Sequence, residues 1–350
     1  MFDWKKQEIL NRANTSTVEK INLLSLFSGM GAFEKALENL NIPYNLVNYC
    51  EIDKYASKAF SLIHNVPEEK NLVDVTKVDT SKIIEKVDLI TYGFPCQDIS
   101  SVGKMRGFVN EQTGETTRSG LFFEALRIIK DLQPKYAIAE NVKNLTGNGF
   151  KEEFAIVLKS LEDIGYVNYW KVLNAKDYGI PQKRERVFIV SIRKDINDYK
   201  FRFPQPIPLK YKLLDLIEDK VDSRYYLEGN RVNILKDMLK KKYNITSKVV
   251  VDSSIKNPKI KEVSNCIIAR YDAGIQNQES MGGVVVEPNG NDLSVRKFTP
   301  KECFRIMGFT DKDVDILISN GLANTRLYKM AGNSIAVNVL EEIFKKLLKS

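Results

Sequence analysis

Short β-rich runs alternate with amphipathic helical patterns over the first 200 residues, and few architectures are compatible with that alternation. Parallel strands need long crossover connections, which helices packed on the sheet supply, so the alternation indicates βαβ units in a doubly wound α/β lobe with a mixed sheet. The expected strands are Ile21–Phe27, Leu46–Glu51, Val87–Tyr92, Tyr136–Glu140, Asn168–Leu173 and Val187–Ile192. The expected helices are Gly31–Leu40, Lys54–Ile63, Leu121–Leu132 and Lys151–Ile164.

The alternation stops at Pro204, Pro206 and Pro208, because prolines at alternate positions cannot continue a helix or a central strand. The lysine-rich and glycine-rich segments that follow have no βα repeat, so we place a domain boundary here. Regular signals return at Thr299, which is a plausible N-cap followed by a proline and, three residues on, by Glu302. A final amphipathic helix is expected over Ser334–Leu348.

Composition narrows the classes of function. The 350 residues suit two lobes, and no apolar run approaches the roughly 20 residues that cross a bilayer, so we expect a cytoplasmic protein. The four cysteines are scattered without a CxxC pair, which predicts neither a disulfide framework nor a metal site. His64 is the only histidine, which argues against catalysis by a Ser-His or Cys-His pair. The formal charge of +8 suits a polyanionic partner but is weak support for one.

A glycine loop and a carboxylate indicate a nucleoside site. The first strand runs into Ser28-Gly29-Met30-Gly31 before a helix begins, and such glycines let a backbone approach a ligand closely. The next strand ends at Glu51, where a carboxylate can accept hydrogen bonds from ribose hydroxyls. Without a third glycine the loop matches the dinucleotide fingerprint poorly, and the pattern leaves open a dinucleotide, S-adenosylmethionine or a βα turn that binds nothing.

A cysteine follows the strand Val87–Tyr92, at the carboxyl edge where open α/β sheets keep their active sites. Pro95 restricts the backbone on both sides of itself, which suits the presentation of a nucleophile at Cys96. A lone cysteine is otherwise a small buried apolar residue. The polar, basic segment 100–119 that follows favours a loop able to close on a substrate.

Two further groups lie near strand ends. Glu140 ends the strand Tyr136–Glu140, where a carboxylate is either an active-site group or a helix cap. Arg184 and Arg186 precede the strand Val187–Ile192 and share one face, because strand side chains alternate. The alternative for the arginines is a solvated charged edge.

Together these segments resemble the cytosine-C5 DNA methyltransferase family, in the order in which the family carries its motifs. The segments that resemble its cofactor motifs are Leu26-Phe27-Ser28-Gly29-Met30-Gly31, Glu51, Asp74 with Val75, and Leu121-Phe122-Phe123-Glu124. Gly93-Phe94-Pro95-Cys96-Gln97, Glu140-Asn141-Val142 and Gln182-Lys183-Arg184-Glu185-Arg186 resemble its catalytic motifs. Arg305-Ile306-Met307-Gly308-Phe309 and Gly332-Asn333-Ser334 resemble its last two. Ser25 and Ala32 depart from the usual aspartate and glycine.

The resemblance implies a reaction and its residues. Cys96 would add to C6 of an extruded cytosine, Glu140 would hold its N3 and amino edge, Arg186 would bind its O2 carbonyl, and Arg184 would join Arg186 in favouring the thiolate. S-adenosylmethionine would be the methyl donor. Its expected binding residues are Phe27, Ser28, Gly29, Gly31, Glu51, Ile52, Asp74, Val75, Pro95, Leu121, Asn333 and Ser334.

The resemblance also implies double-stranded DNA as the partner. Residues 1–200 with 330–350 would form the catalytic and cofactor-binding domain, 201–297 a target-recognition domain and 298–329 a hinge. The expected DNA contacts are Ser100, Lys104, Arg106, Arg270 and Tyr271, although the last two could equally belong to a structural turn. We expect a monomer, and a separately acting restriction endonuclease is left open. The alternatives are a tRNA cytosine-C5 methyltransferase, a catalytically silent DNA-binding homologue and an NAD-dependent oxidoreductase.

Overall fold

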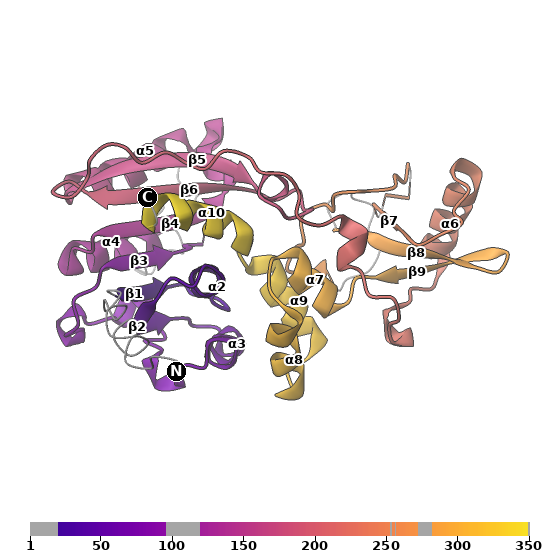
Figure 1. The fold of residues 1–350 in the computed structure, drawn as a ribbon, viewed down its shortest axis with the longest axis horizontal. Helices are drawn as coiled ribbons and strands as arrows, with labels where there is room; N and C mark the ends of the chain where they lie inside the picture. Colours follow the sequence, from indigo (N-terminus) through magenta and orange to yellow (C-terminus); the bar gives the residue numbers. More distant parts are fainter. Residues whose placement is uncertain (1–19, 96–119, 253, 256, 272–281, 349–350) are drawn as a thin grey trace, which may run out of the picture.

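The computed structural model describes residues 20–95, 120–252, 254–255, 257–271 and 282–348. Two lobes are joined end to end (Figure 1), and each has a sheet of its own. The larger lobe contains a six-stranded sheet with helices on both faces, and the smaller lobe contains a three-stranded sheet. The helices α7 (Pro300–Ile306), α8 (Asp311–Ser319) and α9 (Asn324–Asn333) lie between the lobes.

The large sheet has the strand order β2-β1-β3-β4-β6-β5. Its strands are β1 (Ile21–Leu26), β2 (Tyr44–Cys50), β3 (Leu89–Tyr92), β4 (Tyr136–Val142), β5 (Tyr166–Asn174) and β6 (Glu185–Arg193). The first four are parallel, whereas β6 runs antiparallel to both β4 and β5. The chain moves outward in opposite directions from β1 and β3, so the carboxyl ends of these two neighbours flank a switch point, where doubly wound folds bind ligands.

Alternating side chains on each strand build a separate core on each face of this sheet. Leu23 faces a cluster that includes α2 (Ala32–Asn39), α3 (Lys54–His64) and α10 (Val337–Leu348). Leu24 faces the opposite cluster, with α4 (Leu121–Leu132) and α5 (Lys151–Asp163). Both leucines are completely buried, so the sheet is covered on both sides, as apolar parallel strands require.

These elements confirm the α/β fold class predicted from the sequence, with strand and helix bounds shifted by a few residues. The sequence pattern did not reveal the regular structure of the smaller lobe. That lobe contains α6 (Asn230–Lys242) and the antiparallel strands β7 (Val249–Val251), β8 (Val284–Asn289) and β9 (Asp292–Lys297). The last helix begins at Val337 and not at Ser334.

The smaller lobe has a small core of its own. Val232, Leu235 and Leu239 lie on one face of α6 and pack against Val286 and Val295 of the β8–β9 hairpin. Apart from Ile234 and Met238, the rest of α6 is polar, with three lysines in its last turn. A helix this polar is stabilised by packing of a narrow apolar stripe, and so few apolar residues do not produce the broad amphipathic pattern from which a helix is predicted.

The smaller lobe joins α7 through a buried ion pair. The Arg296 guanidinium at the end of β9 donates two hydrogen bonds to the Glu302 carboxylate, at 3.0 and 2.9 Å, and both side chains are fully buried. Glu302 also accepts from the backbone N–H of Thr299, while the Thr299 hydroxyl accepts from the Glu302 N–H. This capping box confirms the predicted start of α7.

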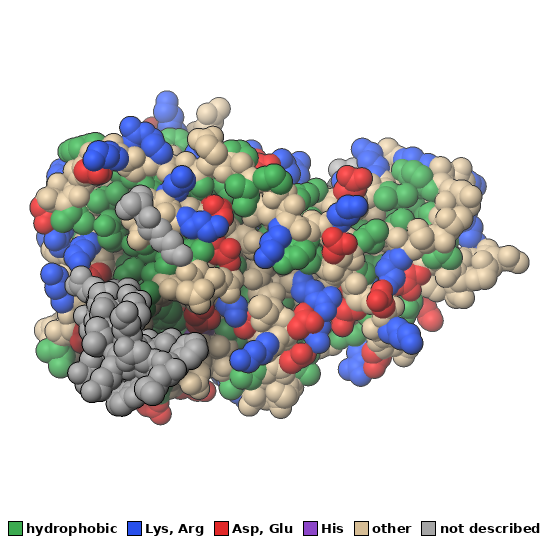
Figure 2. Space-filling model, viewed as in Figure 1, with side chains coloured by type: hydrophobic (Ala, Val, Ile, Leu, Met, Phe, Trp, Pro, Cys, Tyr) green, Lys and Arg blue, Asp and Glu red, His purple; other side chains and the backbone are tan. Residues whose placement is uncertain are grey.

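Charges of both signs are mixed on the surface. On the face shown in Figure 2, Lys and Arg side chains alternate with Asp and Glu over both lobes, with no single basic patch. The net charge of +8 therefore gives little guidance to a binding surface on this face. Within the part of the chain that the structure describes, no helix combines the length and apolarity that a membrane span requires.

Replacing Arg296 with Met should destabilise the protein, because Glu302 would keep a buried charge without its partner. Losing one partner of a buried ion pair costs about 3–5 kcal/mol, measurable as the free energy of unfolding in urea. The matched control is Arg224→Met, which breaks the pair between Arg224 and Asp222 at the solvent-exposed surface and should change stability far less. Equal losses in the two variants would contradict a structural role for the Arg296–Glu302 pair.

Candidate active site

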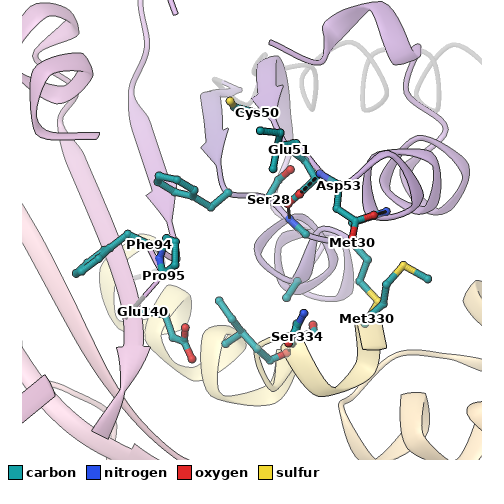
Figure 3. A pocket seen from close by; sticks show the side chains of 18 of the residues that line it. Ser28, Met30, Cys50, Glu51, Asp53, Phe94, Pro95, Glu140, Met330 and Ser334 are labelled. Carbon is teal, nitrogen blue, oxygen red and sulfur yellow. Dashed lines mark hydrogen bonds between the residues drawn. The ribbon is translucent and has the colours of Figure 1, made fainter. Parts of the chain in front are cut away.

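A cavity of about 520 Å³ lies at the carboxyl edge of the large sheet. Figure 3 shows Ser28, Glu51 and Asp53 on one side of it and Phe94, Pro95 and Glu140 on the other. Met330, near the end of α9, and Ser334, the first residue after this helix, line the same cavity. Its volume is in the range of small-molecule sites, which commonly lie at such a switch point.

The loop after β1 supplies Phe27, Ser28, Gly29 and Met30 to the cavity. The Ser28 hydroxyl is buried and has no hydrogen-bond partner among the described residues. A Cβ built on Gly29 would meet no atom within 4 Å, so the space beside this residue is open. A buried hydroxyl without a partner next to open space is suited to a polar ligand, because burial without a hydrogen bond is costly.

Glu51 is held in place by backbone donors. Its carboxylate accepts hydrogen bonds from the N–H of Gly29 and from the N–H of Asp53, both at 2.8 Å. Burial raises the pKa of Glu51 above its ordinary value, and these two donors oppose the shift. An ionised carboxylate has about four acceptor positions, so Glu51 can still accept from hydroxyls of a ligand.

Apolar side chains surround Glu51 at the mouth of the cavity. Ile52 is 73% exposed, and Val73, which the sequence reasoning did not select, is 50% exposed. Asp74, Val75 and Leu121 also line the cavity. Exposed aliphatic groups around a carboxylate can contact the flat face of a base while the carboxylate binds its sugar.

Gly31 serves a different purpose from the one predicted. It is absent from the cavity lining, and its Cβ position lies 2.0 Å from Nε2 of His64. With a φ of 83° it is the N-cap of α2, so the glycine provides room for the buried imidazole beneath the loop. Ala32, one of the two departures from the family pattern, lines the cavity, while Ser25, the other, is buried within β1 and accepts a hydrogen bond from Thr91.

The segment after β3 is fastened to β4. The Asn141 side chain donates to the carbonyl of Phe94 at 2.9 Å, and its Oδ1 accepts from the N–H of Val142. Pro95 lines the cavity and is the last residue described before the gap at 96–119, so Cys96 lies outside the described residues. Asn141 therefore positions the residues that lead to the predicted nucleophile.

Glu140 and Arg186 form a pair across β4 and β6. Nε of Arg186 donates to Oε1 of Glu140 at 3.0 Å, and both side chains are largely buried in the cavity wall. Burial raises the pKa of Glu140, and the guanidinium groups of Arg186 and Arg184 oppose the shift. A carboxyl group with a raised pKa next to a guanidinium can both donate and accept hydrogen bonds with the edge of a polar ring.

Arg184 is committed to the protein itself. Its guanidinium donates to the carbonyls of Ile267, Gly332 and Ser334 and to the sulfur of Cys266. The side chain lines the cavity, but its Nη atoms are engaged by these acceptors. This geometry favours a structural role over the direct catalytic role expected from the sequence.

The C-terminal part of the chain closes the cavity. Asn333 and Ser334 both line it, as does Lys329, which pairs with Asp53 at 2.6 Å. A Cβ on Gly332 would lie 2.2 Å from the backbone N of Ala269, so only glycine permits this close contact between α9 and the chain from the smaller lobe. Sequence spacing gave no signal for Lys329 or Met330, because their approach depends on how α9 packs.

The predicted DNA contacts have different outcomes. Ser100, Lys104 and Arg106 lie outside the described residues. Arg270 is exposed, whereas Tyr271 is 2% exposed, its hydroxyl donates to the carbonyl of Gly283, and it accepts from the N–H of Phe298. The expectation for Tyr271 is therefore corrected: its side chain is part of the core and cannot reach a base. In the described part of the chain, no group of three or more His, Cys, Asp or Glu side chains could hold a metal ion.

Comparison with known families and relatives gives a consistent result. A family model described as C-5 cytosine-specific DNA methylase matches residues 21–349. Type II methyltransferase M2.ScrFI of Lactococcus lactis subsp. cremoris is 38% identical over 90% of this chain and 81% of its own length. Orphan methyltransferase M.SPRI of Bacillus phage SPR is 31% identical over 94% of this chain and 98% of its own length.

Solved structures share the fold. The Entamoeba histolytica methyltransferase EhMeth superimposes with a TM-score of 0.69 at 20% identity, covering 95% of this chain and 98% of its own. The S. pombe Dnmt2 methyltransferase gives 0.68 at 20% identity, covering 94% and 99%. At this level of identity the likeness supports the architecture alone.

The two loop glycines should differ in their tolerance of alanine. Both have a positive φ, so either substitution strains the backbone by about 1–2 kcal/mol. Gly31→Ala should cost about 1–3 kcal/mol more than Gly29→Ala, because its methyl group would collide with His64. Thermal unfolding of the two purified variants measures the difference, and equal melting temperatures would contradict the close packing of His64 on Gly31.

Proposed function

This chain belongs to the family of C-5 cytosine-specific DNA methylases, and from that premise we propose how its residues transfer a methyl group to C5 of a specific cytosine in double-stranded DNA. The observation that best supports the assignment is one cavity with two chemically different sides. Glu51 stands on one side, and the Glu140–Arg186 pair stands on the other. Pro95, the residue before Cys96, lines the same cavity.

We propose that the Glu51 side of the cavity holds S-adenosylmethionine, whose sulfonium makes its methyl group electrophilic. The unpartnered Ser28 hydroxyl and the open space at Gly29 fit a polar ligand there. Glu51 would accept hydrogen bonds from the ribose hydroxyls, and Ile52, Val75 and Leu121, which line the same cavity, would contact the base. The remaining cofactor-side residues in this proposal are Phe27, Asp74, Pro95, Asn333 and Ser334.

The covalent step is assigned to Cys96. Its thiolate forms a bond to C6 of the cytosine, which moves electron density to C5 and makes that carbon nucleophilic. C5 would gain the methyl group as the bond from methyl to the sulfonium sulfur breaks, with its electron pair left on that sulfur and S-adenosylhomocysteine as the leaving group. C5 then loses its proton to water, the electron pair of the C–H bond reforms the C5–C6 double bond, and the bond from the Cys96 sulfur to C6 breaks with its pair on sulfur. The thiolate is thereby regenerated.

Glu140 and Arg186 assist that addition. The carboxyl group, whose pKa is raised by burial, holds a proton against N3 and accepts from the exocyclic amino group, while the Arg186 guanidinium binds the O2 carbonyl. Both contacts draw electron density from the ring as the thiolate adds. We assign Arg184 to positioning rather than to this contact, because its Nη atoms donate to three backbone carbonyls and a sulfur.

We propose that the domains divide this work as the sequence suggested. Residues 1–200 with 330–350 hold the cofactor and the catalytic groups, 201–297 read the DNA and 298–329 connect the two. The cytosine is extruded from the stack at a cost of a few kcal/mol, because C6 is inaccessible inside a duplex. Arg270, Ser100, Lys104 and Arg106 are the proposed DNA contacts. We further propose a cytoplasmic monomer that modifies DNA either beside a separate restriction endonuclease or as an orphan enzyme, since relatives of both kinds match.

Bisulfite sequencing of DNA from cells that express the chain tests the function. Cytosines in one short sequence context should resist conversion, and expression of Cys96→Ser should give no resistant sites although the variant folds and binds cofactor. In vitro, duplex DNA with 5-fluorocytosine at the target position should form a covalent adduct with the wild type only, because fluorine does not leave as a proton does. Substantial methylation by Cys96→Ser would remove Cys96 from the role of nucleophile.

Glu51→Ala should weaken S-adenosylmethionine binding by roughly tenfold or more, because charge-assisted hydrogen bonds contribute about 1.5–3 kcal/mol each. Isothermal titration calorimetry measures the dissociation constant directly. Glu68→Ala removes an exposed carboxylate from a nearby turn and serves as the control, with unchanged affinity expected. Unchanged affinity in Glu51→Ala as well would exclude Glu51 from the ribose site.

A further inference from the structure

His64, the only histidine of the chain, lies directly beneath the proposed cofactor loop. It is the last residue of α3, and its side chain is fully buried. The imidazole packs against the ring of Phe60 on one side and fills the space that the missing Cβ of Gly31 leaves on another. The proposed reaction does not use this buried titratable group.

Both ring nitrogens of His64 face hydrogen-bond acceptors. Nδ1 lies 2.7 Å from Oε1 of Glu38, and Nε2 lies 3.1 Å from the carbonyl oxygen of Met30. A carbonyl cannot donate a hydrogen bond, and neither can an ionised carboxylate. The pKa of Glu38 is lowered, because its contacts with His64, Lys35 and Tyr44 outweigh its burial, so the carboxylate is ionised at neutral pH. A neutral imidazole has one proton and can satisfy only one of these two acceptors, whereas an imidazolium satisfies both.

The surroundings of His64 favour the charged form. On α2, Glu38 pairs with the ring, and Glu34 is completely buried without a hydrogen-bond partner among the described residues. Lys35, on the same helix, binds Asp313 of α8 at 2.7 Å and lies 3.9 Å from Oε2 of Glu38, the carboxylate oxygen that does not bind the ring. From β2, the hydroxyl of Tyr44 donates to Glu38. Burial lowers the pKa of His64, but its bonds to Glu38 and Met30 and the charges of Glu34 and Glu38 outweigh that effect and raise it. Burial also raises the pKa of Glu34, so the contacts of the ring with Glu38 and Met30 are the main support for the charged form.

The bond to Met30 connects this charge to the cavity. Met30 lines the cavity, and its carbonyl lies one residue before Gly31, where α2 has its N-cap. Asp53 and Lys329 form an ion pair that also lines the cavity, and within the described residues the carbonyl of Met30 has its hydrogen bond with Nε2 of His64. A proton at Nε2 therefore adds a bond at Met30 to those that hold the loop at Ser28 and Gly29.

We propose that His64 is a buried imidazolium and a positioning residue: its Nε2–H holds the carbonyl of Met30 and thereby fixes the glycine loop in the shape that receives the cofactor. The positioning role rests on the proposed cofactor site, whereas the charge state does not. The ion pair of His64 and Glu38 would therefore hold the loop that binds the cofactor without touching a substrate itself.

The pH dependence follows from the direction of the pKa shift. Because the folded pKa of His64 lies above its ordinary value of 6.5, the stabilisation is fully present below that value and is lost as the pH rises through the folded pKa. After deprotonation the one remaining proton stays with the charged acceptor, Glu38, and the carbonyl of Met30 loses its donor. Cofactor affinity should therefore fall at alkaline pH.

A single histidine allows a direct test of the charge. In untagged protein labelled with 15N at histidine, the NMR spectrum contains one pair of imidazole nitrogen resonances, and both belong to His64. Both nitrogens should be protonated at about pH 7, and the titration should lie above the ordinary histidine pKa of about 6.5. One unprotonated ring nitrogen at neutral pH would overturn the proposal.

Calorimetric titration with S-adenosylhomocysteine tests the positioning role on the wild type, Glu38→Gln and Tyr44→Phe. Wild-type affinity should fall about fivefold as the pH passes the titration of His64, the size expected for one lost hydrogen bond. In Glu38→Gln the fall should be absent, because the amide can donate to Nδ1 of a neutral ring and leave the proton at Nε2 for Met30. Tyr44→Phe removes only the hydroxyl on Glu38 and should behave as the wild type does.

The comparison cancels the ligand's own titration, because all three proteins bind the same compound. An equal fall in the wild type and in Glu38→Gln would overturn the positioning role. No binding at any pH would instead count against the proposed cofactor site, and the nitrogen resonances would still decide the charge of His64. If Glu38→Gln does not fold, a wild-type affinity that is constant across the titration of His64 overturns the role by itself.

Discussion

The guanidinium of Arg184 is the interaction on which the arrangement of the cavity depends. It stands before β6 and donates to the chain of the smaller lobe at Ile267 and to the end of α9 at Gly332 and Ser334. Three segments distant in sequence thus meet at one planar cation, whose donors are fixed in direction. Gln182 extends the junction, donating to the carbonyl of Ile306 and accepting from the N–H of Ile267. This junction fixes the separation between the Glu140–Arg186 wall and the α9 wall, together with the Lys329–Asp53 pair and the close packing of Gly332 on Ala269.

The part of the site that follows from sequence is the part that depends on one sheet edge. Glu51, Pro95 and Glu140 each lie within three residues of the carboxyl end of a parallel strand, and βαβ topology brings such ends together without any knowledge of packing. The capping box at Thr299 is likewise local, since two residues three positions apart, Thr299 and Glu302, determine it. The positions of these residues could be predicted from strand periodicity and from the places where Gly and Pro interrupt it.

The rest depends on contacts between distant segments. Gly31 was expected to bind a ligand, but its positive φ and its close contact with His64 account for the glycine at this position. A glycine that contacts a ligand and a glycine that contacts a buried side chain cannot be told apart in a sequence. Arg184 was expected to share a face with Arg186 and to favour the thiolate with it. Both side chains do line the cavity, but acceptors from the smaller lobe and from the end of α9 bind the Arg184 guanidinium. Tyr271 was predicted to contact DNA because it follows Arg270. Its ring is instead buried and stacks on Phe298, with 5.5 Å between the ring centroids. Met330 and Lys329 gave no local signal.

Helix α10 has a consequence for how the chain is made. It packs against α2, where Phe344 meets Phe33 at 6.3 Å between ring centroids, and it covers the same face of the sheet as the earliest helices. A ribosome delivers residues 337–348 after every other described helix and strand, so the apolar surface of α2 emerges long before its cover. During most of translation this surface must be shielded by chaperones or by transient collapse, and the loop that α2 carries acquires its final support only when synthesis of this helix is complete.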